Sequence, residues 1–128
     1  MNIGQAAAES GISAKMIRYY ESIDLLDASR RSDAGYRIYG EKDLHALRFI
    51  RRARDLGFSL KQIAVLMALW RDKSRASAEV KKLANEHIAE LEQKAAMLKE
   101  MAATLKNLAD HCHGNDRPDC PILDGLEH

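Results

Sequence analysis

The sequence contains no run of about 18 apolar residues, so it offers no segment suited to crossing a membrane. Its first five residues lack the basic and then apolar pattern of a secretory signal peptide, which predicts a cytoplasmic protein. Cysteine is scarce as well, with only Cys112 and Cys120 in 128 residues. Two cysteines in the reducing cytoplasm rarely form a structural disulfide, so the pair indicates metal binding or redox chemistry instead.

A strong overall charge is also lacking, since the net charge is +1, but the two halves of the sequence differ. Residues 1–75 carry 14 Lys and Arg against 9 Asp and Glu, whereas residues 76–128 carry 6 against 10. A basic first half predicts a polyanionic partner, and an acidic second half predicts a different task. The length leaves room for one small domain and an extension rather than two large domains.

Two short helices joined by a sharp turn are predicted in the first 22 residues. Apolar residues at positions 3, 6 and 7 give the first helix one inward face. Gly11 suits the positive φ of a turn, and Ser13 can cap a second helix that runs to Ser22. This is the helix-turn-helix pattern, although many helical hairpins share it.

A hairpin is predicted next, with a turn centred on residues 33–35 and alternating aromatic and apolar residues that suit a strand at 36–39. A hairpin in this position is called a wing, and it carries Arg30, Arg31, Tyr36 and Arg37. A solvated charged loop is the alternative. Aromatic residues interleaved with arginines favour the wing.

Two further helices follow, one from about Glu41 to Asp55 and one that opens at a capping box formed by Ser59 and Gln62. Gly57 ends the first of them. The apolar spacing turns these residues toward a core: Leu44, Leu47, Phe49, Ile50, Ile63, Leu66, Met67 and Trp70. Residues 71–78 are polar and are expected to connect to the next element.

The most regular stretch is a heptad seam, formed by Ala84, Ile88, Leu91, Ala95, Leu98, Ala102, Leu105 and Ala109. Neither Gly nor Pro interrupts it, which predicts one helix from about Ser77 to Asp110, roughly 50 Å long. So small a chain cannot bury such a seam by itself, and we expect a tightly packed homodimer. A single long helix lying across its own domain is the alternative.

The seam is followed by a loop between the two cysteines, and Pro121 suits the first position of a short terminal helix. Seven residues separate Cys112 from Cys120, too many for a CxxC redox motif. Thiolates are soft ligands that select Cu(I), Ag(I) and similar ions, and two of them can hold a monovalent ion in linear geometry. His111 and His113 keep a Zn(II)-type site open as an alternative.

Two other functions compete with metal sensing. An enzyme would need a nucleophile with its base or an open metal position, and a heptad rod is a poor wall for a substrate pocket, so no enzyme is expected. A regulator switched by reversible oxidation of Cys112 and Cys120 remains open.

With these motifs in this order, the sequence resembles the MerR family of metal-responsive regulators, and most of all its copper-sensing CueR-type members. The resemblance covers essentially the whole chain. It rests on MIRYYE at 16–21, GYRIY at 35–39, RARDLGFSL at 52–60 and the segment Cys112-x7-Cys120-Pro121.

The resemblance implies a mainly α fold. A winged helix-turn-helix DNA-binding domain would occupy 1–75, a long antiparallel coiled-coil dimerisation helix 76–110, and a metal-binding loop with a short C-terminal helix 111–128. The homodimer would bind promoter DNA and, with metal bound, distort the DNA so that RNA polymerase can start transcription.

DNA contacts are expected on the second helix, the wing and the third helix. The resemblance puts Arg18 and Tyr20 on the DNA, with Lys15 near the same face, and carries Tyr36, Arg37 and Arg54 over as phosphate contacts. A guanidinium can pair with phosphate, and such contacts position the protein without reading sequence. For Tyr19 we prefer core packing, and for Arg48 and Arg51 a solvated helix face and a DNA role are equally open.

For the metal, the resemblance implies Cu(I), or alternatively Ag(I) or Au(I), bound by Cys112 and Cys120. In the family, the start of the dimer helix reaches the partner's metal loop, and sensors of divalent ions carry Cys there. Ser77 stands at that position here, as in the monovalent sensors, so it is the expected selectivity residue.

Overall fold

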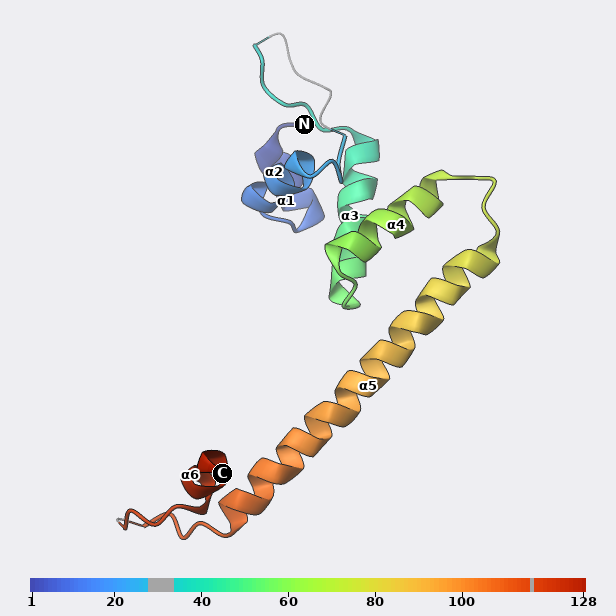
Figure 1. The fold of residues 1–128 in the computed structure, drawn as a ribbon. Helices are drawn as coiled ribbons and strands as arrows, with labels where there is room; N and C mark the ends of the chain where they lie inside the picture. Colours follow the sequence, from blue (N-terminus) through green and yellow to red (C-terminus); the bar gives the residue numbers. More distant parts are fainter. Residues whose placement is uncertain (28–33, 116) are drawn as a thin grey trace. The chain divides into compact units, whose positions relative to one another are not determined.

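The computed structural model describes residues 1–27, 34–115 and 117–128 (Figure 1). These residues form six helices: α1 Ile3–Ser10, α2 Ala14–Ser22, α3 Glu41–Asp55, α4 Leu60–Arg71, α5 Ser77–Asp110 and α6 Pro121–Glu127. They divide into two compact units, Met1–Val80 and Lys81–His128. Within the described ranges, no helix is long and apolar enough to cross a membrane.

The predicted helix-turn-helix is confirmed, and local capping defines its ends. Asn2 and Gln5 form a capping box at the start of α1, and Ser13 accepts a hydrogen bond from the Met16 N–H at the start of α2. Each such cap stabilises a helix by about 1 kcal/mol. Gly11 ends α1 with a φ of 73°, as the turn requires, and its N–H donates to the Ala7 carbonyl.

A long-range contact from α3 also closes the end of α1. Arg51 Nη1 donates to the Ser10 carbonyl oxygen at 3.2 Å. A Cβ added at Gly11 would lie 1.7 Å from that nitrogen, so the glycine leaves the space that the guanidinium occupies. For Arg51 the structure therefore provides a structural role, which the two alternatives considered from the sequence did not include.

The core of this unit lies where α1 packs on α2 and α3, and α3 packs on α4. Its largest fully buried side chains are Ile17, Leu47, Ile50, Ile63 and Met67. Each contributes roughly 1.5–3 kcal/mol by leaving water. The inward face predicted for the two helices is therefore largely confirmed.

Trp70 departs from the expected core. It is 40% exposed at the end of α4. Its ring stacks on Phe49, itself only partly buried, with centroids 4.7 Å apart and planes 12° apart. The helical spacing indicated the correct face, but Trp70 lies one turn beyond Met67, the last buried residue of α4.

The strand expected at 36–39 is wrong for the described residues. In this segment only Arg37 forms a bridge, and no strand extends from it. Tyr39 pairs with the N-terminus: the Tyr39 N–H donates to the Met1 carbonyl at 2.7 Å, and the Met1 amino group donates to the Tyr39 carbonyl at 2.8 Å. Arg30, Arg31 and the turn residue Asp33 lie outside the described residues.

The long helix is confirmed with the expected bounds, and much of its seam is open to water. Ile88, Leu91, Leu98 and Leu105 are between 41% and 64% exposed. The described part of this single chain therefore leaves these side chains uncovered.

The contact between Gly11 and Arg51 can be tested with a matched pair of substitutions. Gly11→Ala is expected to lower the free energy of unfolding by about 2 kcal/mol, roughly half from strain at positive φ and half from displacing Arg51 from Ser10. Gly35→Ala is the control, because φ is 84° there and an added Cβ would meet nothing within 4 Å. Urea unfolding at one protein concentration measures both. Equal losses would show that the Arg51 contact contributes nothing.

Candidate functional site

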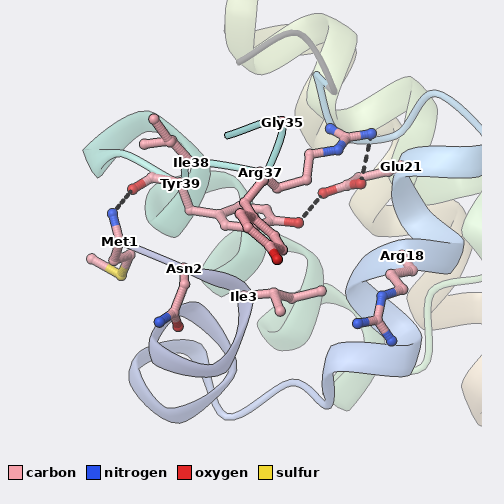
Figure 2. A pocket seen from close by; sticks show the side chains of 10 residues that line it. Met1, Asn2, Ile3, Arg18, Glu21, Gly35, Arg37, Ile38 and Tyr39 are labelled. Carbon is pink, nitrogen blue, oxygen red and sulfur yellow. Dashed lines mark hydrogen bonds and ion pairs between the residues drawn. The ribbon is translucent and has the colours of Figure 1, made fainter. Parts of the chain in front are cut away.

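A buried carboxylate links α2 to the segment that follows residue 34. The side chain of Glu21, on α2, is only 6% exposed. It forms an ion pair with Arg37 Nη2 at 2.9 Å and accepts a short hydrogen bond from the Tyr39 hydroxyl (Figure 2). Burying a carboxylate is costly unless it is paired and hydrogen-bonded, and these two partners meet that need.

Tyr39 is fixed as the donor in this network. Burial, and then the hydrogen bond to the Glu21 carboxylate, raise the pKa of the Tyr39 phenol well above its ordinary value. The phenol therefore keeps its proton throughout the physiological pH range. The backbone bonds between Tyr39 and Met1 hold the same residue from its other side (Figure 2).

A hollow of about 920 Å³ lies beside this network. Its wall combines Met1–Ile3, Arg18 and Glu21 of α2, and residues 35–39. Arg18 and Arg37 thus line one concave surface, although they are 19 positions apart in the sequence. Figure 2 shows Arg37 turned to Glu21, and Arg18 on the neighbouring turn of α2.

The expected DNA contacts on α2 differ in exposure. Lys15 and Arg18 are exposed, whereas Tyr20 is only 3% exposed and lies in the core. The Tyr20 hydroxyl accepts a hydrogen bond from Arg54 Nη1 at 3.4 Å, so it reaches the surface through that arginine. The preference for packing Tyr19 in the core is wrong, because Tyr19 is 45% exposed.

The positions of Tyr19 and Tyr20 around the helix axis explain why Tyr20 is buried and Tyr19 is exposed. The buried residues of α2 are Ile17, Tyr20 and Glu21, which share one face at spacings of three and four. Tyr19 falls on the opposite face. The same spacing would have identified Glu21 as a buried carboxylate in need of partners, a functional residue that the sequence reasoning missed.

The remaining expected contacts are at the surface. Tyr36 is 75% exposed, and Arg54 is exposed at the end of α3. Arg48 lies 3.8 Å from the Glu9 carboxylate, and both side chains are exposed, so this pair contributes little to stability.

The two cysteines mark the ends of one loop. Cys112 lies two residues after the end of α5, and its N–H donates to the Ala109 carbonyl at 3.0 Å. Cys120 directly precedes α6, and its carbonyl accepts from the Asp124 N–H at 3.0 Å. Both thiols are free and partly buried. The expected short helix that begins with Pro121 is confirmed.

The last turn of α5 contacts α6. The Leu108 side chain lies against Gly125, where an added Cβ would be 2.9 Å from a Leu108 methyl carbon. The two helices that carry the loop ends therefore touch each other. As a donor set, two partly buried thiols fit a soft metal ion, since thiolates prefer such ions.

The histidines beside Cys112 differ from each other. His111 Nδ1 lies 2.7 Å from the Asn107 carbonyl oxygen, which makes Nδ1 the protonated nitrogen and leaves Nε2 as the remaining donor atom for a metal. His113 is exposed. Among the described residues, which omit 28–33 and 116, no three His, Cys, Asp or Glu side chains gather as a metal-binding cluster. Ser77 is the exposed first residue of α5.

Two family profiles match the chain. One is described as MerR HTH family regulatory protein and matches residues 1–69. The other is described as MerR, DNA binding, and matches residues 44–108. Together they cover α1 to α4 and nearly all of α5.

Curated relatives agree with these profiles. The chain is 63% identical over 126 residues to heavy metal-dependent transcription regulator 2 of Rhizobium meliloti, covering 98% of this chain and 86% of the relative. It is 42% identical over 126 residues to the HTH-type transcriptional regulator CueR of Salmonella typhimurium, covering 98% and 91%.

Solved structures share the fold. PbrR691 from Ralstonia metallidurans, in complex with lead(II), has a TM-score of 0.85 at 32% identity and is matched over 98% of both chains. HiNmlR, a MerR family regulator bound to promoter DNA, has a TM-score of 0.58 at 26% identity over 86% of this chain and 83% of its own. These matches exclude the enzyme considered from the sequence, because the matched proteins are transcription regulators. The chain belongs to the MerR family of helix-turn-helix transcription regulators and groups with its heavy-metal-responsive members.

Proposed function

We propose that this regulator binds promoter DNA as a homodimer and activates transcription on binding Cu(I), by distorting the DNA so that RNA polymerase can start. The observation that carries the metal assignment is the pair of free, partly buried thiols at the two ends of one loop, Cys112 and Cys120. Ag(I) and Au(I) share the same soft chemistry and are the alternative ions.

Two thiolates suit a monovalent ion better than a divalent one. Linear coordination by two sulfurs satisfies a d10 monovalent ion, whereas Zn(II) takes four ligands in structural sites. His111 donates its Nδ1–H to a backbone carbonyl and keeps Nε2 as a donor atom, so it is the residue that a Zn(II)-type site would add to the two cysteines. CueR of Salmonella typhimurium is among the relatives that match nearly the whole chain.

A divalent soft metal is the second candidate, and one observation favours it. The PbrR691 structure, which has the same fold at 32% identity, contains lead(II). Ser77 would favour the monovalent ion over the divalent one, because a serine at the start of α5 adds no third thiolate. The redox switch remains a third possibility for the same two cysteines.

The DNA-binding part of the proposal rests on the basic Met1–Val80 unit. Lys15, Arg18, Tyr36, Arg37 and Arg54 would contact the DNA, and Tyr20 would support Arg54 through its hydroxyl. Arginine and lysine at such positions bind phosphates and fix the register of the protein on the duplex. Such a regulator would act in the cytoplasm, where it meets promoter DNA and RNA polymerase.

The dimer part of the proposal rests on the open seam of α5. Helices with apolar residues at heptad spacing pair along that seam. The exposed leucines from Leu91 to Leu105 offer a second copy of this chain such a surface.

Removing either thiol tests the metal assignment. Cys112→Ser or Cys120→Ser should weaken metal binding by at least about 100-fold, because the loss of even an outer-shell partner costs 10–100-fold. Anaerobic titration with Cu(I) measures this, and a DNA-binding assay on the same proteins should show unchanged affinity. His113→Ala is the matched control and should retain the metal. An equal loss of DNA binding in the cysteine variants would contradict this division of labour.

Placing a charge in the seam tests the dimer. Leu98→Glu should raise the dimer dissociation constant by at least about 100-fold, since an unpaired buried charge costs roughly 3–5 kcal/mol. Gln93→Glu makes the same charge change on α5 outside the seam and should leave the dimer intact. Sedimentation of both variants measures the effect. A dimeric Leu98→Glu protein would mean that the interface lies elsewhere.

A third thiolate tests ion selectivity. Ser77→Cys should gain at least about a tenfold response to Zn(II) and Cd(II), while Ala78→Cys, whose side chain leaves the helix about 100° away, should not. Promoter activation across Cu(I), Ag(I), Zn(II) and Cd(II) measures both variants. The Cu(I) assignment would be wrong if the unmodified protein already answered Zn(II) and His113→Ala removed that answer.

A further inference from the structure

We propose that Glu21 is a positioning residue for DNA binding, holding Arg37 on the wall of the hollow that Arg37 shares with Arg18, so that both guanidinium groups receive one phosphate strand. This inference rests on the proposed DNA-binding function and assigns a role to an acidic residue in a basic surface. The geometry that carries it is the buried carboxylate between α2 and residues 35–39.

The first step is that Glu21 has little freedom of its own. Its side chain is 6% exposed on the buried face of α2, between Arg37 Nη2 at 2.9 Å and the Tyr39 hydroxyl. Tyr39 is in turn held by backbone hydrogen bonds to Met1. The carboxylate is therefore a fixed point to which the guanidinium of Arg37 is attached.

The second step is that Arg37 can hold the carboxylate and a phosphate at once. A guanidinium has five N–H donors in a rigid fork, and the ion pair with Glu21 uses Nη2. A quarter of the Arg37 side chain remains exposed. This exposed quarter is the part of the side chain that a phosphate can approach while Nη2 stays on Glu21.

The third step is the shared hollow. Arg18 and Arg37 both line it (Figure 2). Tyr36, 75% exposed, is a further lining residue. Two cations on one concave surface suit a polyanionic strand. Fixing Arg37 before binding lowers the ordering cost that a free arginine side chain would incur on the DNA.

The role of Glu21 can be tested, because two explanations predict opposite changes in DNA affinity when its charge is removed. If Glu21 acted only as a negative charge near the DNA, Glu21→Gln would tighten binding by removing repulsion. If Glu21 positions Arg37, Glu21→Gln weakens binding, because a neutral amide no longer forms the ion pair. Glu9→Gln makes the same charge change at an exposed position on α1 and is the matched control.

The experiment uses the full-length protein and a fluorescent duplex of mixed sequence, since a phosphate contact acts on every sequence. Affinity is measured over a range of salt concentrations. We expect Glu21→Gln to bind about tenfold more weakly, as the loss of a charge-assisted hydrogen bond would produce. Its salt slope should also be smaller by about 0.9 for each phosphate that the variant no longer neutralises. Glu9→Gln should bind at least as tightly as the unmodified protein.

A double-mutant cycle with Arg37→Ala tests whether Glu21 affects DNA binding through Arg37. Glu21→Gln should have almost no further effect on affinity or salt slope once Arg37 is absent. Affinity equal to or tighter than that of the unmodified protein, an unchanged salt slope, or the same loss in both backgrounds would overturn the proposal. If the unmodified protein itself does not bind the duplex, the proposed function fails rather than this inference.

Folding is checked by circular dichroism and thermal unfolding of each variant. Should Glu21→Gln unfold, Tyr39→Phe takes its place, because it removes only the hydroxyl that donates to Glu21. A weakening of about threefold that disappears in the Arg37→Ala background supports the positioning role. Unchanged binding by Tyr39→Phe would overturn it.

Discussion

Leucine side chains that face water along α5 are the constraint on which the rest of the molecule depends. A helix gains little net stability from its own hydrogen bonds, and most helical stability in proteins comes from packing an apolar face. Here that face stays open in the single chain, from Ile88 to Leu105. Since α5 begins at Ser77 and ends just before Cys112, the helix that needs a partner also leads directly from the basic unit to the thiol loop.

The Met1–Val80 unit is subject to a second constraint, which is a buried charge rather than an exposed apolar surface. Glu21 is kept out of water only because Arg37 and Tyr39 satisfy it. One unit therefore leaves an interaction surface open, whereas the other uses a satisfied polar cluster to connect α2 to residues 35–39.

Local rules predicted most of the fold. Caps and turns depend on residues three or four positions apart, so Ser13, Gly11 and the Ser59–Gln62 box could be identified directly from the sequence. The heptad seam likewise predicted α5 with its observed bounds. The assignment of Tyr19 to the core failed because it ignored the phase set by the buried face of α2.

Long-range contacts account for what the sequence could not predict. Arg51 and Ser10 are 41 positions apart, and their hydrogen bond depends on how α3 packs beside α1. The ion pair of Glu21 with Arg37 and the open position of Trp70 also follow from packing. For the thiol loop, the chemistry of the cysteines was evident from the sequence, whereas the contact between α5 and α6 was not.

That contact has a consequence for the entropy of the loop. Because Leu108 rests on Gly125, the two helices that flank the ten residues from 111 to 120 are held in contact by their own side chains. Closing a flexible loop costs conformational entropy, and here part of that cost is met when the chain folds. A glycine with no side chain is thus what lets α6 lie on α5, and under the proposed metal binding it would make the affinity of the loop for an ion partly a property of helix packing.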